Sequence, residues 1–473
     1  MQQSLTQWKR RKLQESTGIS HKEVILEKGL RLNISDWKPE TIQSVMKDLT
    51  FVPRVIFDTG TPPPPICCYQ AEDGALTLPR CYGGLGTITS VKDSLAEGEE
   101  ISLDSRASLN PLQQQAFEAS CSALRKSPHA CVLTLPCGFG KTVVSLVIAA
   151  SLGRKTLVVV HKENLLVQWL ERVKTFLPNA RTGVIQQGKA EFRDVDVCLA
   201  MLQTICCRQM PEGCLESFGT IVLDEAHHLA APYFSQLFFK LPCRYILGLT
   251  ATPKRKDGCS EILHLFMGPF SFQLSSRTDA DVKVFVSSWR NKFTCNHDPT
   301  PPEVQRYKTR LTVDKGRNAH ILELCSAAAN AGRNIICLSD RVEHLVGLKE
   351  EWRLAARHPE VSCALFIGGR GKVNSQERKF AEDSARVIFA TFAMAAEGLD
   401  IPRLDTLILA TPVGDVTQAV GRILRPCAEK KSPVVVDICD DGCKAFGRLA
   451  VIRRGCFERS AFQVFQDVIP CFE

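Results

Sequence analysis

The sequence contains no apolar run long enough to cross a bilayer, and stretches such as 143–152 have polar flanks. Residues 1–12 are polar and basic, without an apolar core, so we expect no secretory leader. The 21 cysteines form no CxxC pair and show no Cys/His spacing typical of a zinc site. The segment 439–443 (CDDGC) fits a capped turn better than a metal site. We therefore expect reduced thiols, an intracellular reducing compartment and no membrane partner.

Composition indicates a multidomain globular protein. At 473 residues the chain has room for roughly three domains. Its 44% hydrophobic and 23% charged residues exclude wholesale disorder, collagen and coiled coil. The net charge of +8 favours an anionic partner only weakly, because it is spread over the whole chain.

The first hundred residues differ in composition from the rest. The basic run Lys9–Lys12 fits either a nuclear-import or phosphate-contacting patch or a solvated helix end. Proline punctuation and short apolar runs at 66–69 and 76–80 favour short strands joined by turns. A polar stretch at 96–105 is typical of a linker. We predict a small N-terminal β-containing accessory domain over 1–105.

Two series of short apolar runs, separated by helical or polar sequence, fill the rest of the chain. Such runs are typical of parallel strands buried on both faces of a doubly wound sheet. The first series is 130–135, 156–160, 195–200, 220–223 and 245–249, with a helix over 142–150. The second series is 334–338, 362–367, 385–390, 406–409 and 434–438. We predict α/β domains over 106–290 and 291–455, a tail over 456–473, a polar region near 291–317 dividing the sheets, and a cleft between the halves.

A glycine-containing segment lies directly between the first strand and its helix. Glycines let backbone N–H groups face an anion, and the helix N-terminus adds a favourable dipole. Lys141 would reach the β- and γ-phosphates of a nucleotide, and the Thr142 hydroxyl would bind Mg²⁺. Leu135 stands where the strict P-loop pattern has glycine, so the loop taken alone also fits an incidental glycine turn. The candidate phosphate-binding residues are Pro136, Cys137, Gly138, Phe139, Gly140, Lys141 and Thr142.

Two carboxylates, Asp224 and Glu225, follow the strand at 220–223. In P-loop enzymes an acidic residue at this place holds Mg²⁺, and its neighbour can polarise the attacking water. An acidic pair at a strand end is often only a helix cap. Its position in the same β-α series as Lys141 instead favours Asp224 as a magnesium ligand and Glu225 as the base of ATP hydrolysis.

Two arginines three residues apart, Arg422 and Arg425, share one helical face in the second half. Arginines at such a place can neutralise charge that develops on a γ-phosphate. A solvated or salt-bridged pair is the alternative for the two residues taken alone.

The ordered motifs resemble those of superfamily 2 helicases and translocases over 110–425. Gln113 matches the adenine-reading glutamine of that superfamily, whose looser P-loop accommodates Leu135. The box Asp224–His227 is similar to DEAH. Gln418 and the closing 421–425 resemble the xeroderma-pigmentosum-B-like branch and, within it, the helicases of large double-stranded DNA viruses. The resemblance implies two tandem RecA-like domains that use ATP and Mg²⁺.

The resemblance also implies further functional residues. Gly398 and Asp400 would lie on the nucleotide side of the second domain. The basic turn Lys254–Lys256 fits a nucleic-acid contact or a solvated loop equally. Segments 160–162 and 166–169 resemble motif Ia, and 201–204 resembles the strand-contacting motif after it. The residues implied to contact nucleic acid or couple it to the nucleotide are Gln203, His227, Thr250, Thr252, Thr391 and Gln418.

Three interpretations remain open. The first is a DNA helicase of viral replication or transcription, in the host nucleus or a viral replication site, with other replication or transcription proteins as partners. The second is a duplex translocase that does not separate strands, and the third is an RNA-stimulated ATPase. A non-enzymatic subunit would have lost Lys141, Glu225 or Arg425, and all three are present. No metal-nuclease constellation is recognisable, which disfavours a restriction-type subunit.

Overall fold

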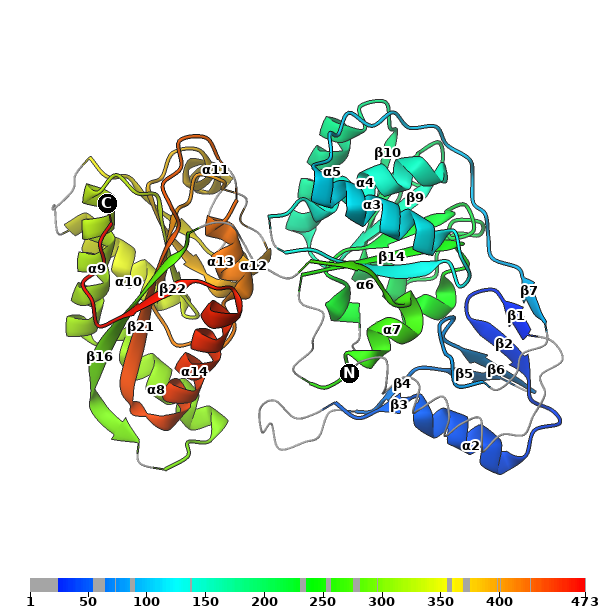
Figure 1. The fold of residues 1–473 in the computed structure, drawn as a ribbon, viewed down its shortest axis with the longest axis horizontal. Helices are drawn as coiled ribbons and strands as arrows, with labels where there is room; N and C mark the ends of the chain where they lie inside the picture. Colours follow the sequence, from blue (N-terminus) through cyan, green and yellow to red (C-terminus); the bar gives the residue numbers. More distant parts are fainter. Residues whose placement is uncertain are drawn as a thin grey trace. The chain divides into compact units, whose positions relative to one another are not determined.

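The computed structural model describes residues 24–53, 64–72, 74–85, 90–136, 138–229, 235–251, 257–274, 281–295, 297–354, 360–368, 375–397, 399, 401–425 and 427–472, and the statements below concern these residues. The basic run Lys9–Lys12 lies outside them. The chain divides into two compact units, 1–135 with 140–274 and 275–473 with 136–139, and each is described by itself (Figure 1). No helix in the described ranges has both the length and the apolar character needed to cross a membrane.

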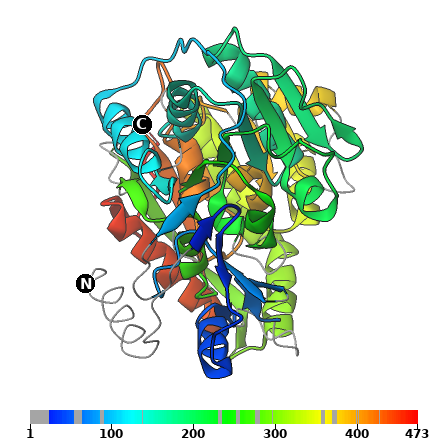
Figure 2. The same cartoon turned by 90° about the vertical axis from the view of Figure 1, so that its right-hand side faces the viewer.

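A small β-rich module opens the first unit. Its five-stranded sheet has the order β5-β6-β2-β1-β7, in which β7 runs parallel to β1 and the other neighbours are antiparallel. The expected short strands at 66–69 and 76–80 are confirmed as β4 and β6, and β4 pairs with β3. Figure 2 shows α2, in blue, below these strands. The elements are β1 (Val24–Leu26), β2 (Leu30–Asn33), α2 (Pro39–Asp48), β3 (Thr50–Phe51), β4 (Ile66–Cys67), β5 (Gln70–Glu72), β6 (Ala75–Leu78) and β7 (Val91–Asp93).

The module shares a continuous hydrophobic core with the rest of the first unit. Arg80 is only 4% exposed, and its guanidinium donates to the backbone carbonyls of Cys243 and Arg244 at 3.0 and 3.1 Å. The amide of Gln236 donates to the carbonyl of Cys67 at 2.8 Å. Because burying a guanidinium is favourable only when its donors are satisfied, the Arg80 contacts fix the module in one position on this unit.

The larger sheet of the first unit is parallel and doubly wound. Its order is β11-β10-β12-β9-β13-β14-β8-β15, and only the edge strand β11 is antiparallel to its neighbour. The five strands predicted from the apolar runs are confirmed as β8, β9, β12, β13 and β14, which are buried on both faces. The strands are β8 (Ala130–Thr134), β9 (Thr156–Val160), β10 (Thr182–Gln186), β11 (Lys189–Ala190), β12 (Val197–Met201), β13 (Thr220–Leu223), β14 (Tyr245–Thr250) and β15 (Phe270–Gln273).

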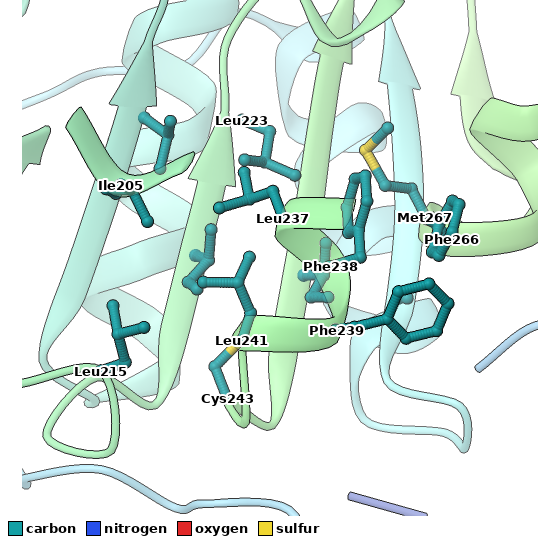
Figure 3. Close-up of a cluster of buried hydrophobic side chains, with 14 of the residues drawn as sticks. Ile205, Leu215, Leu223, Leu237, Phe238, Phe239, Leu241, Cys243, Phe266 and Met267 are labelled. Carbon is teal, nitrogen blue, oxygen red and sulfur yellow. The ribbon is translucent and has the colours of Figure 1, made fainter. Parts of the chain in front are cut away.

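Helices cover both faces of this sheet. In Figure 1, α3 (Pro111–Leu124), α4 (Lys141–Leu152) and α5 (Glu163–Phe176) lie above it, and α6 (Leu202–Cys207) and α7 (Glu261–Met267) lie below. Two short 3₁₀ helices, η1 (Ala226–Leu229) and η2 (Ser235–Lys240), follow β13. Figure 3 shows Leu237 and Phe238 of η2 against Leu223 and Phe266, and the rings of Phe238 and Phe266 stack at 4.5 Å. This apolar packing anchors the chain on both sides of the turn after β13.

The second unit is built on a seven-stranded parallel sheet of order β18-β19-β17-β20-β21-β16-β22. The predicted second series is confirmed as β17 to β21. Figure 1 shows α9 and α10 on one side of the sheet and α12, α13 and α14 on the other. The strands are β16 (Lys283–Cys295), β17 (Ile335–Ser339), β18 (Cys363–Phe366), β19 (Val387–Thr391), β20 (Thr406–Leu409), β21 (Val434–Cys443) and β22 (Gln463–Gln466). The helices are α8 (Pro301–Thr312), α9 (Lys315–Asn330), α10 (Val342–Leu354), α11 (Ser375–Asp383), α12 (Phe392–Glu397), α13 (Thr417–Ile423) and α14 (Lys444–Arg459).

The polar region 291–317 is part of the second unit in the structure. Residues up to Cys295 belong to β16, so the expected division at 290/291 falls inside that strand. The second half of β16 alternates exposed and half-buried residues, which gives it a polar sequence although it pairs with β21. Residues 301–312 form α8. The predicted tail 456–473 likewise contains the end of α14 and the strand β22, which pairs with β16.

A buried ion pair joins α9 to β21. The Arg317 guanidinium is fully buried and donates to both carboxylate oxygens of Asp440, at 2.7 and 2.8 Å, and to the carbonyl of Ala410 at 2.7 Å. Asp440 lies in the segment 439–443 that the sequence presents as a capped turn, and the structure makes this segment the end of β21. The Asp440 carboxylate is thus committed to a structural pair.

Candidate active site

The loop between β8 and α4 has the backbone of an anion cradle. Gly138 and Gly140 have φ angles of 81° and 87°, in the left-handed region that side chains rarely adopt. Gly140 is the N-cap of α4 and carries no side-chain cap. Lys141 donates from Nζ to the carbonyl of Leu135 at 3.1 Å. The first N–H groups of a twelve-residue helix therefore point out of a glycine turn beside a lysine, which suits a phosphate.

The other predicted residues of this loop follow β8 or begin α4. Pro136 and Phe139 lie in the turn, Thr142 is the second residue of α4, and Cys137 lies outside the described residues.

Gln113 lies against this loop. It is the third residue of α3 and forms a capping box with Asn110, in which its Oε1 accepts from the Asn110 N–H at 3.0 Å. Its Nε2 would be 2.7 Å from a Cβ placed on Gly140. A side chain at position 140 would therefore displace the Gln113 amide, and the left-handed φ of Gly140 would strain it as well. The structure brings the predicted glutamine to the predicted phosphate loop, on the same edge of the sheet.

Asp224 is fixed by three hydrogen bonds just past the end of β13. Its backbone N–H donates to Val159 O of the neighbouring strand β9 at 3.1 Å. Its Oδ1 accepts from the Glu225 N–H at 2.9 Å, and its Oδ2 accepts from the Trp169 indole N–H at 2.8 Å. Burial and the like charge of Glu225 raise the pKa of Asp224, while the Trp169 bond and the Lys141 ammonium act in the opposite direction. Lys141 and Asp224 are therefore electrostatic neighbours.

Glu225 has a strained backbone. Its φ of 46° lies in the left-handed region, which is uncommon for a residue with a side chain. Such strain persists only where the surrounding structure holds it in place, and it gathers at functional turns. The left-handed backbone at Glu225 ends the strand direction directly after Asp224.

His227 joins Glu225 to the next strand. Its Nδ1 lies 3.4 Å from Glu225 Oε2 and 3.2 Å from the hydroxyl of Thr250, a fully buried residue at the end of β14. The structure thus brings together His227 and Thr250, two of the six residues expected to contact nucleic acid or couple it to the nucleotide. Thr252 and the basic turn Lys254–Lys256 lie outside the described residues.

The neighbouring strand ends carry the segment that resembles motif Ia. Gln203, on α6 after β12, donates from Nε2 to the carbonyl of His161 at 3.0 Å. Burial and the adjoining Lys162 lower the pKa of His161, and burial lowers the pKa of Lys162. All of these residues follow the carboxyl ends of parallel strands, which is where ligands bind in open α/β sheets.

In the second unit the predicted residues cluster after β19 and on α13. The Thr391 hydroxyl accepts from the Met394 N–H at 3.3 Å. Gln418 and Arg422 lie on α13, and Arg425 follows it. The Arg422 guanidinium donates to the carbonyls of Ala395 and, at 2.9 Å, Leu399. Arg422 thus binds the segment after Thr391, within its own unit.

Lys430 joins the segment that carries Arg425 to the segment before β20. It donates from Nζ to the carbonyls of Arg425 and Pro402, at 2.7 and 2.9 Å. Gly398 and Asp400 lie outside the described residues.

Comparison with known proteins gives one consistent result. A family described as "Type III restriction enzyme, res subunit" matches residues 106–255. A protein of Acanthamoeba polyphaga mimivirus named as an ATP-dependent RNA helicase is 29% identical over 442 residues, which cover 90% of this chain and 83% of that protein. An African swine fever virus protein with a similar name is 28% identical over 336 residues, covering 65% of this chain and 64% of the relative. The chain is therefore similar over most of its length to viral proteins named as ATP-dependent helicases, and its residues 106–255 match the restriction-enzyme res-subunit family.

Solved structures show the same fold. The DNA-bound Type ISP restriction-modification enzyme LlaBIII matches with a TM-score of 0.53 and 16% identity, over 76% of this chain and 31% of that one. Dbp5 of S. cerevisiae, bound to RNA and ADP BeF3, matches with a TM-score of 0.53 and 13% identity, over 77% and 90% of the two chains. The prediction of two tandem RecA-like α/β domains is therefore confirmed for this chain.

Two contacts of this site could not be expected from the sequence. Trp169 belongs to the segment that resembles motif Ia, but its bond to Asp224 was not expected. Its sequence signal is that of a core residue, because Leu165, Leu166, Trp169 and Val173 form one buried stripe of α5. The binding of Lys430 to two backbone carbonyls leaves no signal in sequence at all.

Proposed function

We propose that the chain is a DNA-directed, ATP-dependent helicase or translocase of the xeroderma-pigmentosum-B-like branch, acting in the replication or transcription of a large double-stranded DNA virus. One observation carries the proposal. A single sheet edge gathers the Gln113–Gly140 contact, the carboxylates of Asp224 and Glu225, and the pairing of His227 with Thr250. Groups suited to bind a nucleotide and groups suited to transmit its state are therefore neighbours, which supports the proposal.

Hydrolysis follows from the chemistry of these groups. The α4 N–H groups and Lys141 would hold the phosphates, and Lys141 would offset the charge that grows on them during transfer. Glu225 would take the proton of the attacking water. Its strained backbone supports this role, because strain of this kind gathers at functional sites.

Magnesium suits the donors that are present. The Thr142 hydroxyl and the Asp224 carboxylate supply only oxygen, the ligand that Mg²⁺ prefers, and each Asp224 oxygen keeps a lone pair beyond its one hydrogen bond. Bound Mg²⁺ would supply Lewis-acid stabilisation of the phosphoryl oxygens. We propose Thr142 and Asp224 as its protein ligands.

We propose that Arg425 and Arg422 neutralise charge on the γ-phosphate during hydrolysis. The bonds of Arg422 to Ala395 and Leu399 support a further role for this residue, in which it transmits the state of α13 to the segment after Thr391. We also propose that Gly398 and Asp400 lie on the nucleotide side of the second unit.

Nucleic acid would bind at the strand ends that carry Gln203, Thr250 and Thr391, with Gln418 coupling it to α13. Contacts of this kind reach phosphates and sugars, so binding should be largely independent of sequence and sensitive to salt. All cysteines in the described part of the chain are free thiols, which supports a reducing compartment.

RNA is the second candidate substrate, favoured by the names of the viral relatives. We expect ATP hydrolysis by the purified chain to be stimulated more by single-stranded or duplex DNA than by RNA at equal nucleotide concentration. Raising salt from ~50 to ~200 mM should weaken DNA binding, so that the DNA concentration for half-maximal stimulation rises at least ~10-fold. Stronger stimulation by RNA would reassign the substrate, and no stimulation by any nucleic acid would refute the proposal.

A further inference from the structure

Trp169 occupies an unusual place for a core tryptophan. It lies in the middle of α5, is 2% exposed, and belongs to the stripe that packs α5 against β9 and β12. Asp224 follows β13, the neighbour of β9, and its backbone is bonded to Val159. The indole therefore reaches beyond the end of β9 to the carboxylate on the adjoining strand.

The bond between them is directional and charge-assisted. An indole N–H can only donate, and at 2.8 Å from Nε1 to Oδ2 it is well within the range of a strong bond to a carboxylate. The Glu225 N–H holds the other oxygen at 2.9 Å. With one donor on each oxygen, the carboxylate plane of Asp224 is fixed, and each oxygen keeps a lone pair for another partner.

The packing of Trp169 in the core does not by itself require a carboxylate as the partner of the indole N–H. A buried indole N–H needs an acceptor, and a backbone carbonyl would satisfy it. Here the acceptor is the one carboxylate that we assign to magnesium. Groups that hold a metal ligand through such a bond set its orientation, and their loss usually costs 10- to 100-fold in metal affinity or activity.

Helix α5 also connects the bond between Trp169 and Asp224 to residues proposed to lie on the nucleic-acid side. α5 begins at Glu163, directly after His161 and Lys162, whose segment resembles motif Ia. The carbonyl of His161 is itself held by Gln203 at 3.0 Å. A displacement of the first turn of α5 would be carried along the helix to Trp169.

We propose that Trp169 is the positioning residue for Asp224: its indole sets the carboxylate for Mg²⁺ and links the 160–162 segment to the metal ligand. The proposal rests on the proposed function, because it takes Asp224 as a magnesium ligand. It adds a route by which nucleic acid at one end of α5 alters the nucleotide site.

The test uses Trp169→Phe in the full chain, which keeps an aromatic ring and removes the donor. We expect the Mg²⁺ concentration for half-maximal binding of a fluorescent ADP analogue to rise about tenfold, with binding restored at saturating Mg²⁺. Stimulation of ATP hydrolysis by DNA should fall as well. Trp352→Phe, at a tryptophan of α10 that is 8% exposed, is the matched control and should behave as the wild type.

Equal Mg²⁺ dependence in Trp169→Phe and wild type would overturn the inference while leaving the proposed function intact. Failure of the wild type itself to bind the analogue with Mg²⁺ would refute the proposed function instead. If Trp169→Phe does not fold, wild-type protein labelled with 5-fluorotryptophan decides the matter by fluorine NMR, with signals assigned from Phe variants of the other four tryptophans. Adding Mg²⁺ at saturating ADP should shift the Trp169 signal, and an unmoved signal would overturn the inference.

Discussion

Lys141→Ala is expected to abolish ATP hydrolysis. The lysine is the first residue of α4, its ammonium lies within bonding distance of Leu135 O, and no other described lysine lies in the glycine turn. Removing a preorganised charge of this kind usually costs at least about 100-fold in turnover. The measurement is phosphate release at saturating DNA. Lys174→Ala, at an exposed position in the last turn of α5, removes the same charge from the same sheet face and should leave turnover unchanged.

Near wild-type hydrolysis in Lys141→Ala, with the protein folded, would discard the assignment of the loop between β8 and α4 as the phosphate site.

Glu225→Gln is expected to stop hydrolysis without weakening nucleotide binding. Glutamine keeps the shape of the side chain but cannot accept the proton of the attacking water, and loss of a general base typically lowers turnover by about 10²- to 10⁴-fold. Turnover and the dissociation constant of a fluorescent ADP analogue should be measured together. Glu216→Gln, on an exposed residue ahead of β13, is the matched control.

A parallel loss of binding and turnover in Glu225→Gln would mean that the residue holds the turn after β13 in shape and does not act on water. Unchanged turnover would move the base to another group. The two failures are separable because binding is read without hydrolysis.

Ten of the parallel strands, β8, β9, β12 to β14 and β17 to β21, could be predicted from sequence because each contains an uninterrupted apolar run. β10, β15 and β22 carry polar residues among the apolar ones and were not predicted. β9, β13 and β20 match their predicted limits residue for residue. The misleading segment was β16, whose outer half alternates polar and half-buried side chains and so resembles a connection. The polar stretch 96–105, expected as a linker, instead runs along the first unit, where the Ala96 N–H donates to Pro242 O at 2.8 Å.

The residues of the candidate site also divide into those that the sequence predicts and those that it does not. Residues fixed by local spacing, such as Gly140 with Lys141 and Asp224 with Glu225, could be named from sequence because the motif and the turn are the same few residues. The role of Gln113 was implied only through resemblance, and its contact with Gly140 was not predicted. The bond between Trp169 and Asp224 joins side chains 55 residues apart, and Arg422 reaches two backbone carbonyls. Pairings of that kind depend on the packing of α5 and α13, which no local pattern records.

Strand displacement tests the central claim that this chain converts ATP hydrolysis into movement along nucleic acid. The substrates are a forked DNA and a triplex with labelled third strand, each given ATP and Mg²⁺. We predict that wild-type protein releases a labelled strand from at least one of them with ATP, and releases none with a non-hydrolysable analogue or with Lys141→Ala. DNA-stimulated hydrolysis that releases neither strand, or equal release with the analogue, would contradict the account.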